Sequence, residues 1–164
     1  MFAMSGASRN HNAIAWQLQL LVAQHILGRK CQGYTSDTRV LVTPGELYTY
    51  PDLSATCDEP RYADERVDTL LNPTLVVEIT SPGTEDYDRG KKARLYRAMP
   101  SLKDLLLVAQ DQYDVELYQR RDDGNWSLFH AVGLEASVHL ASIDCTLRLA
   151  ELYARVVLET KESA

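Results

Sequence analysis

The sequence predicts an α/β fold in which helices flank a mixed central β-sheet. The first observation is the run Pro73–Thr80, whose apolar and β-branched residues are typical of a strand covered on both faces. The second is that helical patterns lie on either side of this run, in residues 12–27 and 86–98. The third is the order along the chain, in which helices and groups of extended segments follow one another as in α/β proteins.

Three segments are predicted to be helical. In residues 12–27 the apolar side chains recur at helical spacing, and Ser8 or Asn10 is available to cap the helix start. Residues 86–98 carry acids in their first turn, which favours a helix because of the helix dipole. Residues 147–157 are expected to form a closing helix.

The extended segments are separated by turn residues. Residues 43–46 form a Thr-Pro-Gly-Glu turn and residues 122–125 an Asp-Asp-Gly-Asn turn, so each is expected to join two strands into a hairpin. Residues 57–72 are polar and acidic and are predicted to be a long connection. The predicted strands are residues 38–43, 47–57, 73–80, 102–109, 115–121 and 126–132.

The length and composition indicate one globular domain. The chain has 164 residues, of which 45% are hydrophobic and 24% charged, so a single domain over residues 1–164 is expected. No apolar run reaches the roughly 18 residues that span a bilayer, and the start lacks the features of a secretory signal. A cytoplasmic protein with no membrane partner is therefore expected.

The three cysteines give little sign of a shared site. Cys31, Cys57 and Cys145 are widely spaced, and no CxxC pair occurs. An odd number of unclustered cysteines favours reduced, structural thiols over a disulfide framework or a zinc site.

The charge pattern combines an acidic whole with one basic cluster. The net charge of −6 argues against tight nonspecific binding of nucleic acid by the whole surface, because such binding needs many phosphate contacts. The basic cluster consists of Arg89, Lys91, Lys92, Arg94 and Arg97. A cluster of this kind is more often a solvated helix face than a binding site.

Two acids lie inside predicted strands. Asp52 follows Tyr50-Pro51, and Glu78 follows an apolar run. A buried carboxylate is costly unless it is paired or binds a metal. If the two strands pair, both carboxylates and the carbonyl oxygen of Ile79 would hold one divalent cation, and oxygen ligands suit magnesium or manganese. A nearby lysine would then stabilise negative charge that develops on a phosphodiester.

Structural interpretations compete with this hypothesis. From the residues alone, a structural pair with Lys92 or Arg39 explains the two acids better, because structural ion pairs also occupy clefts. His11 at the start of the first helix is more often a local cap than a functional group. Tyr96, together with Tyr87, fits a core-facing helix stripe better than a base-stacking surface.

The sequence resembles a known nuclease family. The resemblance rests on Tyr50-Pro51-Asp52, on residues 72–82 (NPTLVVEITSP), on residues 87–92 (YDRGKK) and on Tyr96, with Gly6-Ala7-Ser8 and His11 before the first helix and Trp126 after the second hairpin. Each piece alone is common, but their order and spacing are specific. The chain is similar, from about Ala3 to Tyr153, to the Uma-type restriction endonucleases of the PD-(D/E)XK nuclease superfamily.

This resemblance implies a restriction-endonuclease-like core with an extra β-hairpin and magnesium-dependent cleavage of DNA. It implies that Asp52 and Glu78 are metal ligands. The usual superfamily lysine, two residues after the glutamate, is replaced by Thr80, and Lys92 from the following helix matches instead, with Lys91 as the weaker candidate. Asp88 matches as an acid near the ligands. The family segment that carries a glutamate before Ala3-Met4-Ser5 has no counterpart in this sequence.

Two functions are therefore expected from the sequence. The first is a metal-dependent endonuclease in which Asp52 and Glu78 bind magnesium or manganese and Lys92 stabilises charge, with His11, Asp88 and Thr80 nearby. The alternative is an inactive relative of the same fold, a DNA-binding or protein-interaction module. Its contacts would come from Arg89, Lys91, Arg94 and Arg97. Cutting both strands of a duplex is easiest for a symmetric pair, so a homodimer is a further expectation.

Overall fold

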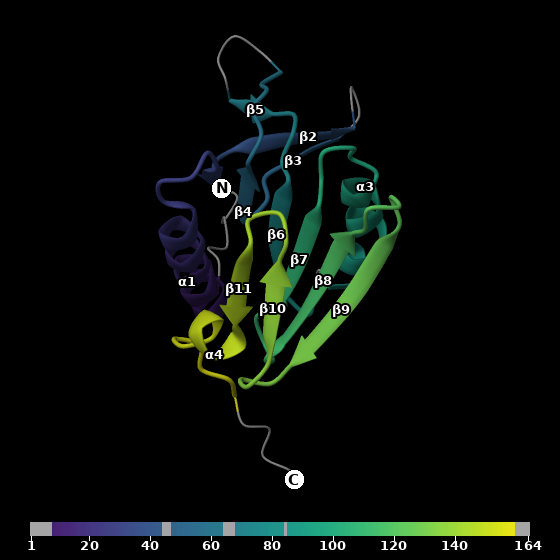
Figure 1. Cartoon of the computed structure of the whole chain (residues 1–164). Coiled ribbons are helices and arrows are strands. Elements are labelled where there is room, and N and C mark those ends of the chain that lie inside the picture. Colours follow the sequence, from purple (N-terminus) through teal and green to yellow (C-terminus); the bar gives the residue numbers. More distant parts are fainter. Residues whose placement is uncertain (1–7, 44–46, 64–67, 84, 160–164) are drawn as a thin grey trace, which may run out of the picture.

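The computed structural model describes residues 8–43, 47–63, 68–83 and 85–159. Its centre is a six-stranded sheet in which only β6 and β7 are parallel among the neighbouring pairs. This mixed sheet, flanked by helices, confirms the predicted fold class (Figure 1). In spatial order the strands are β1 (Gln32–Thr35), β4 (Leu53–Thr56), β6 (Leu75–Thr80), β7 (Asp104–Ala109), β8 (Asp114–Arg120) and β9 (Trp126–Val132).

One face of the sheet is covered by the long helix α1 (Arg9–Ile26) and the C-terminal elements. Helix α1 is amphipathic, and Ile14, Leu18, Val22 and Ile26 are its buried residues. The hydroxyl of Ser8 accepts a hydrogen bond from the backbone of His11 and so caps the helix start. The hairpin β10 (Ser137–Leu140) and β11 (Cys145–Arg148) and the short helix α4 (Leu149–Leu152) complete this layer.

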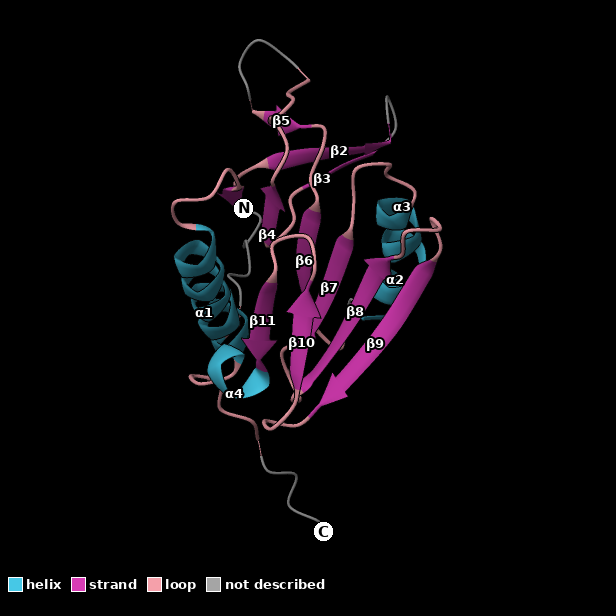
Figure 2. Cartoon of the chain, viewed as in Figure 1, coloured by secondary structure: helices cyan, strands magenta, loops and turns pink. Residues whose placement is uncertain are grey.

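A second hydrophobic cluster lies on the opposite face of the sheet. Figure 2 shows the helical segment and the small sheet that contribute to it. Its helical part is one continuous segment made of α2 (Glu85–Tyr87), a π-helix (Asp88–Lys92) and α3 (Ala93–Arg97). A small three-stranded sheet supplies the rest and contains β2 (Arg39–Thr43), β3 (Leu47–Thr49) and β5 (Thr69–Leu70). None of the described helices has the length and apolar character needed to cross a bilayer.

Two predicted elements differ in the structure. The expected strand over residues 47–57 is two strands, because Pro51 cannot donate to a ladder and the chain leaves the small sheet there for the central one. The hairpin with residues 38–43 is confirmed for β2 and β3, while its turn at residues 44–46 lies outside the described residues. The expected helix over 147–157 is confirmed only for Leu149–Leu152, since Leu147 alternates between exposed neighbours as part of β11.

The cysteine prediction is also wrong. Cys31 and Cys57 form a disulfide with an S–S distance of 2.04 Å, and Cys145 is the free, buried cysteine. The reason is strand register, since Gln32 of β1 lies opposite Thr56 of β4 and the next pair outward is Cys31 and Cys57. Their Cα atoms are 3.9 Å apart. The spacing of cysteines in the sequence does not reveal that two strands far apart along the chain are paired in the sheet.

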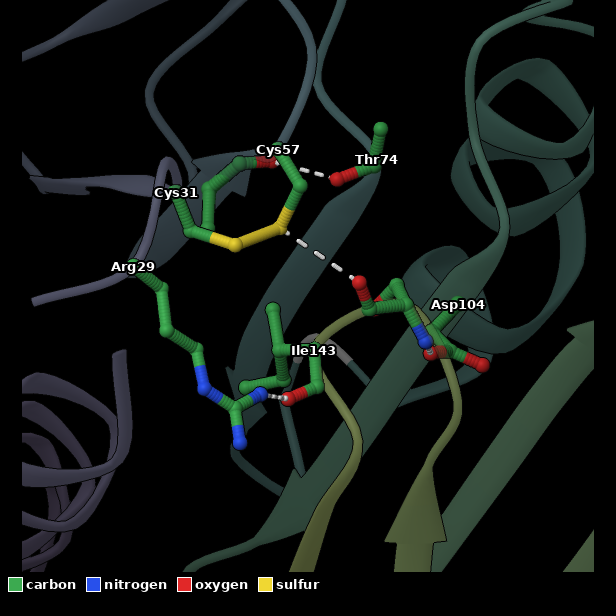
Figure 3. Close-up of a disulfide and its surroundings, with 8 residues drawn as sticks. Arg29, Cys31, Cys57, Thr74, Asp104 and Ile143 are labelled. Atoms are coloured by element: carbon green, nitrogen blue, oxygen red, sulfur yellow. Dashed lines mark hydrogen bonds between the residues drawn. A yellow bond between two sulfur atoms is a disulfide. The ribbon is translucent and has the colours of Figure 1, made fainter.

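The disulfide lies beside the turn between β10 and β11 (Figure 3). The Sγ atom of Cys57 is 3.4 Å from the carbonyl oxygen of Ser142, which is a contact because a disulfide sulfur carries no hydrogen. Arg29 donates to the carbonyl of Ile143 at 2.8 Å, and the N–H of Ser142 donates to buried Asp104 at 2.7 Å. Three separate parts of the chain therefore hold this turn.

Replacing Arg120 by methionine is expected to lower the free energy of unfolding by about 2 kcal/mol. Its guanidinium donates to the carbonyls of Arg97, Met99 and Leu102 at 3.2, 2.8 and 2.8 Å, where α3 ends. These acceptors would lose a charged donor while staying largely buried. Urea denaturation measures the change.

The matched control for this prediction is Arg121→Met. Arg121 is more than half exposed and pairs at 3.4 Å with the similarly exposed Asp123. A surface pair of this kind contributes little, so its loss is expected to change stability by less than about 1 kcal/mol. Equal losses in the two variants would contradict the role assigned to Arg120.

Candidate active site

The pairing of β4 with β6 brings the two strand acids together. Leu53 lies opposite Val77 in this antiparallel ladder, so Asp52 continues the register opposite Glu78. Glu78 is 5% exposed, and the Asp52 side chain is 17% exposed. The two carboxylates are close enough that the charge of Asp52 contributes to raising the pKa of Glu78.

Asp52 is held from two directions. Its Oδ2 atom accepts a hydrogen bond from the backbone N–H of Ile79 at 2.7 Å, which ties it to β6. Its Oδ1 atom lies 3.0 Å from Nε2 of His11 in the first turn of α1. This hydrogen bond raises the pKa of His11 against the opposing effect of burial, and the charges of Asp52 and Glu78 act in the same direction. His11 therefore contacts the site rather than acting as a helix cap.

Glu78 has partners on the helical side of the sheet. Its Oε1 atom is 2.8 Å from Nζ of Lys92 and accepts a hydrogen bond from the hydroxyl of Tyr96 at 2.6 Å. The Tyr96 hydroxyl is also 2.8 Å from that of Thr49 on β3. Burial raises the pKa of Glu78 and outweighs the lowering by Lys92 and Tyr96.

The π-helix places the lysine. Lys92 is its last residue and is followed directly by Ala93, which is fully buried in the core. Since the next buried residue of α3 is Tyr96, the core fixes the rotation of this helix and thereby the side on which Lys92 lies. Lys91 is exposed and has no described contact with Glu78. π-Helices are rare in proteins, and those that occur are often found at functional sites.

The remaining predicted residues have different surroundings. Buried Thr80 is at the end of β6, where its hydroxyl donates to the carbonyl of Val108 at 3.4 Å. Arg97 stacks on the ring of Tyr118, 4.4 Å from its centroid, and Arg94 is exposed. The side chains of Asp88 and Arg89 lie outside the described part of the structure.

Arg39, one of the two structural partners expected for the acids, is engaged elsewhere. Arg39 donates to Thr69 at 2.9 Å, lies 3.6 Å from Asp68 and stacks on Tyr48. Lys92 is the other structural partner considered, and it contacts Glu78.

Two residues at this site were not identified from the sequence. Tyr96 was interpreted as a core residue, and it is indeed 1% exposed, but its hydroxyl bonds Glu78. The available signal was chemical, because a buried tyrosine hydroxyl usually has a polar partner. Thr49 gave no signal, since its place depends on the contact between the small sheet and α3.

The oxygen donors at the site fit a hard divalent cation. Among the described residues, no group of three or more His, Cys, Asp and Glu side chains is arranged around a common point. Magnesium, however, is usually bound through one or two carboxylates together with water and substrate phosphates. The contacts of Glu78 with Lys92 and Tyr96 given above are both made by its Oε1 atom, and each Asp52 oxygen has a second lone pair.

Comparisons with known proteins agree with this description. The family model Uma2, described as "Putative restriction endonuclease", matches residues 1–150. The uncharacterized protein slr1290 of Synechocystis sp. is 42% identical over 132 residues, covering 79% of this chain and 67% of the relative. The uncharacterized protein sll1609 of the same organism is 33% identical over 138 residues, covering 84% and 78%.

A solved structure shares the fold. The crystal structure of "a putative nuclease belonging to DUF820" from Anabaena variabilis aligns with a TM-score of 0.74 at 17% identity, covering 92% of this chain and 83% of the other. At 17% sequence identity this structural similarity shows only that the two proteins share a fold. By fold, the protein is therefore a mixed α/β protein of the same kind as that structure. The chain belongs to the Uma2 family. The resemblance stated from the sequence is therefore confirmed.

Proposed function

We propose that this protein is a magnesium- or manganese-dependent endonuclease that hydrolyses DNA phosphodiester bonds, with a site of the PD-(D/E)XK type. The observation that carries the proposal is the meeting of Asp52 and Glu78 on neighbouring strands, with the ammonium of Lys92 2.8 Å from Glu78. Membership of a family described as restriction endonucleases supports a nuclease-like function. DNA as the substrate is part of the proposal.

Asp52 and Glu78 would hold the cation, with the carbonyl oxygen of Ile79 as a third donor. When bound, the cation would supply Lewis-acid activation of the phosphate and of a water. The N–H of Ile79 and Nε2 of His11 keep the Asp52 carboxylate oriented, and Tyr96 does the same for Glu78. Lys92 would stabilise the negative charge that develops on the phosphodiester oxygens. Hydrolysis of one P–O bond leaves a phosphate on one product end.

The helix that carries Lys92 would also contact the DNA backbone. Lys91 and Arg94 are exposed on this helix, next to the site. Arg97 stacks on Tyr118 and donates to the carbonyl of Ala93 at 3.3 Å, so it would bind phosphate only with the atoms that remain. In the alternative function, a binding module without cleavage, these residues carry the interaction.

Calorimetric titration with manganese tests the site without a choice of DNA sequence. The parent is expected to bind one Mn²⁺ per chain, and Asp52→Asn/Glu78→Gln is expected to weaken binding at least about tenfold. The control is Asp58→Asn/Glu59→Gln, which removes the same charge from exposed positions. Its affinity is expected to match that of the parent.

Equal manganese affinity in the parent and the Asp52/Glu78 variant would contradict the proposal. In that case a binding module is tested next with a duplex oligonucleotide. Charge reversal at Lys91 and Arg94 would abolish binding, whereas Asp52→Asn would not.

A further inference from the structure

Strand β9 is an edge of the central sheet without the usual protection. It is the last strand in the sheet order, and no described strand pairs with its outer side (Figure 1). Residues 126–132 (WSLFHAV) contain no Asp, Glu, Lys, Arg or Pro. Exposed edges are normally blunted by charges, prolines, bulges or shortness, because an open edge pairs with other chains. This seven-residue edge has none of these features.

The same strand concentrates exposed apolar side chains. Leu128, Phe129 and Val132 are 53%, 50% and 62% exposed, and Leu134 just beyond the strand is 41% exposed. Neighbouring Ser127 and Ala131 are small and partly buried. Successive side chains of a strand point to opposite faces, so Leu128 and Val132 lie on one face of this edge and Phe129 on the other. Exposed apolar side chains on both faces of a sheet edge indicate an interaction site.

The hydrogen-bond pattern fixes which backbone groups are available. The N–H of Gly133 donates to Tyr113 at 2.8 Å, and the N–H of Arg121 donates to Asn125 at 2.7 Å, at the two ends of the β8–β9 ladder. Since hydrogen-bonded pairs alternate in antiparallel strands, the odd-numbered residues of β9 bond to β8. The N–H and C=O groups of the even-numbered residues therefore point outward, and these residues are Trp126, Leu128, His130 and Val132.

We propose that β9 pairs with β9 of a second copy of this chain, in an antiparallel dimer with its two-fold axis at Phe129. This is the register that pairs the whole strand with itself. Leu128 then lies opposite His130 of the second copy, and Trp126 opposite Val132, so that all outward backbone groups are satisfied. Two Phe129 side chains meet in a pair without hydrogen bonds, where side chains are closest.

The strand fits its own copy better than an unrelated peptide. Large residues meet large ones and the small pair Ser127 and Ala131 meet each other, as an isologous interface requires. The chain has a net charge of −6, which opposes association in general, yet this edge brings no like charges together. No charged residue of β9 is present to select an acidic or a basic peptide.

Sedimentation equilibrium tests the dimer. The parent is expected to show the mass of two 18.5 kDa chains. Leu128→Lys is expected to raise the dimer dissociation constant on the order of 100-fold, because the two-fold axis repeats the substitution on both sides of Phe129 at the centre of the interface. Trp16→Lys is the matched control on α1, where Trp16 is 69% exposed, and it is expected to leave the dissociation constant unchanged.

Cysteine cross-linking tests the register. Phe129→Cys is expected to give a covalent dimer on oxidation, because residues opposite each other in such a pair lie within disulfide reach. Ser127→Cys lies on the same face but opposite Ala131, so it is expected to stay monomeric on a denaturing gel. A parent that sediments as a monomer, a Leu128→Lys variant that dimerises like the parent, or a covalent dimer from the Ser127→Cys variant in place of the Phe129→Cys variant would overturn the proposal.

Discussion

Replacing Lys92 by alanine is expected to lower the rate of manganese-dependent DNA cleavage by about 100- to 1,000-fold, the usual effect of removing one preorganised donor from developing charge. The effect is expected to be large because the ammonium is held in place: Nζ lies 2.8 Å from Glu78, the side chain is 18% exposed, and the core-packed α3 follows it directly. Single-turnover rates on plasmid DNA, at saturating manganese, measure the loss.

Lys91→Ala provides the matched control. It removes the same charge from the adjacent residue, which is exposed. Its cleavage rate is expected to fall by less than about tenfold, as for one weakened phosphate contact. Circular dichroism and urea denaturation of both variants separate a lost donor from lost structure. Equal rate losses in two folded variants would show that Lys92 contributes charge alone, without a specific position.

Reducing the Cys31–Cys57 disulfide is expected to lower the free energy of unfolding by about 3.5 kcal/mol in the chain-entropy treatment of a loop of this size. The bond joins residues 26 positions apart and links the edge strand β1 to β4. For a chain of this length the melting temperature is expected to fall by roughly 7–14 °C. Thermal unfolding with and without dithiothreitol measures the shift.

The double variant Cys31→Ala/Cys57→Ala is the control for this measurement. It is expected to unfold like the reduced parent and to be indifferent to dithiothreitol, because Cys145 has no partner cysteine. A parent whose melting temperature is the same in both conditions would show that the bond contributes no stability. Loss of the disulfide is also expected to loosen the β10–β11 turn, which Cys57 contacts.

Much of the fold could be predicted because local patterns agree with tertiary structure. The apolar run of β6 is buried throughout, as a strand covered on both faces should be, and the spacing of α1 gives its buried stripe. The predicted helix over 147–157 starts too early because Cys145 and Leu147 fit the alternation of a strand that pairs with β10, and only Leu149–Leu152 are helical. The Cys31–Cys57 bond could not be predicted, since it depends on the register of β1 and β4.

The part of the candidate site that could be predicted is the pair of acids, because a charged residue within an apolar strand segment is unusual. Asp52 and Glu78 attract attention because acids rarely occur inside apolar strands. The contacts of Tyr96, Thr49 and His11 come from three other elements, and no local pattern reports their meeting. The assignment of metal ligands and of Lys92 to catalysis stays a prediction, as do the single domain over residues 1–164 and the cytoplasmic location.

The π-helix has a consequence for how the length of this segment is constrained. A π-turn accommodates one residue more than an α-turn, while an α-helix rotates by about 100° per residue. Deleting Gly90 would leave Ala93 and Tyr96 in the core but would turn the preceding residues about a quarter of the way around the helix axis. A deletion before Lys92 would therefore leave this lysine in place beside Ala93, while the residues that precede the deletion would face a different direction around the helix axis.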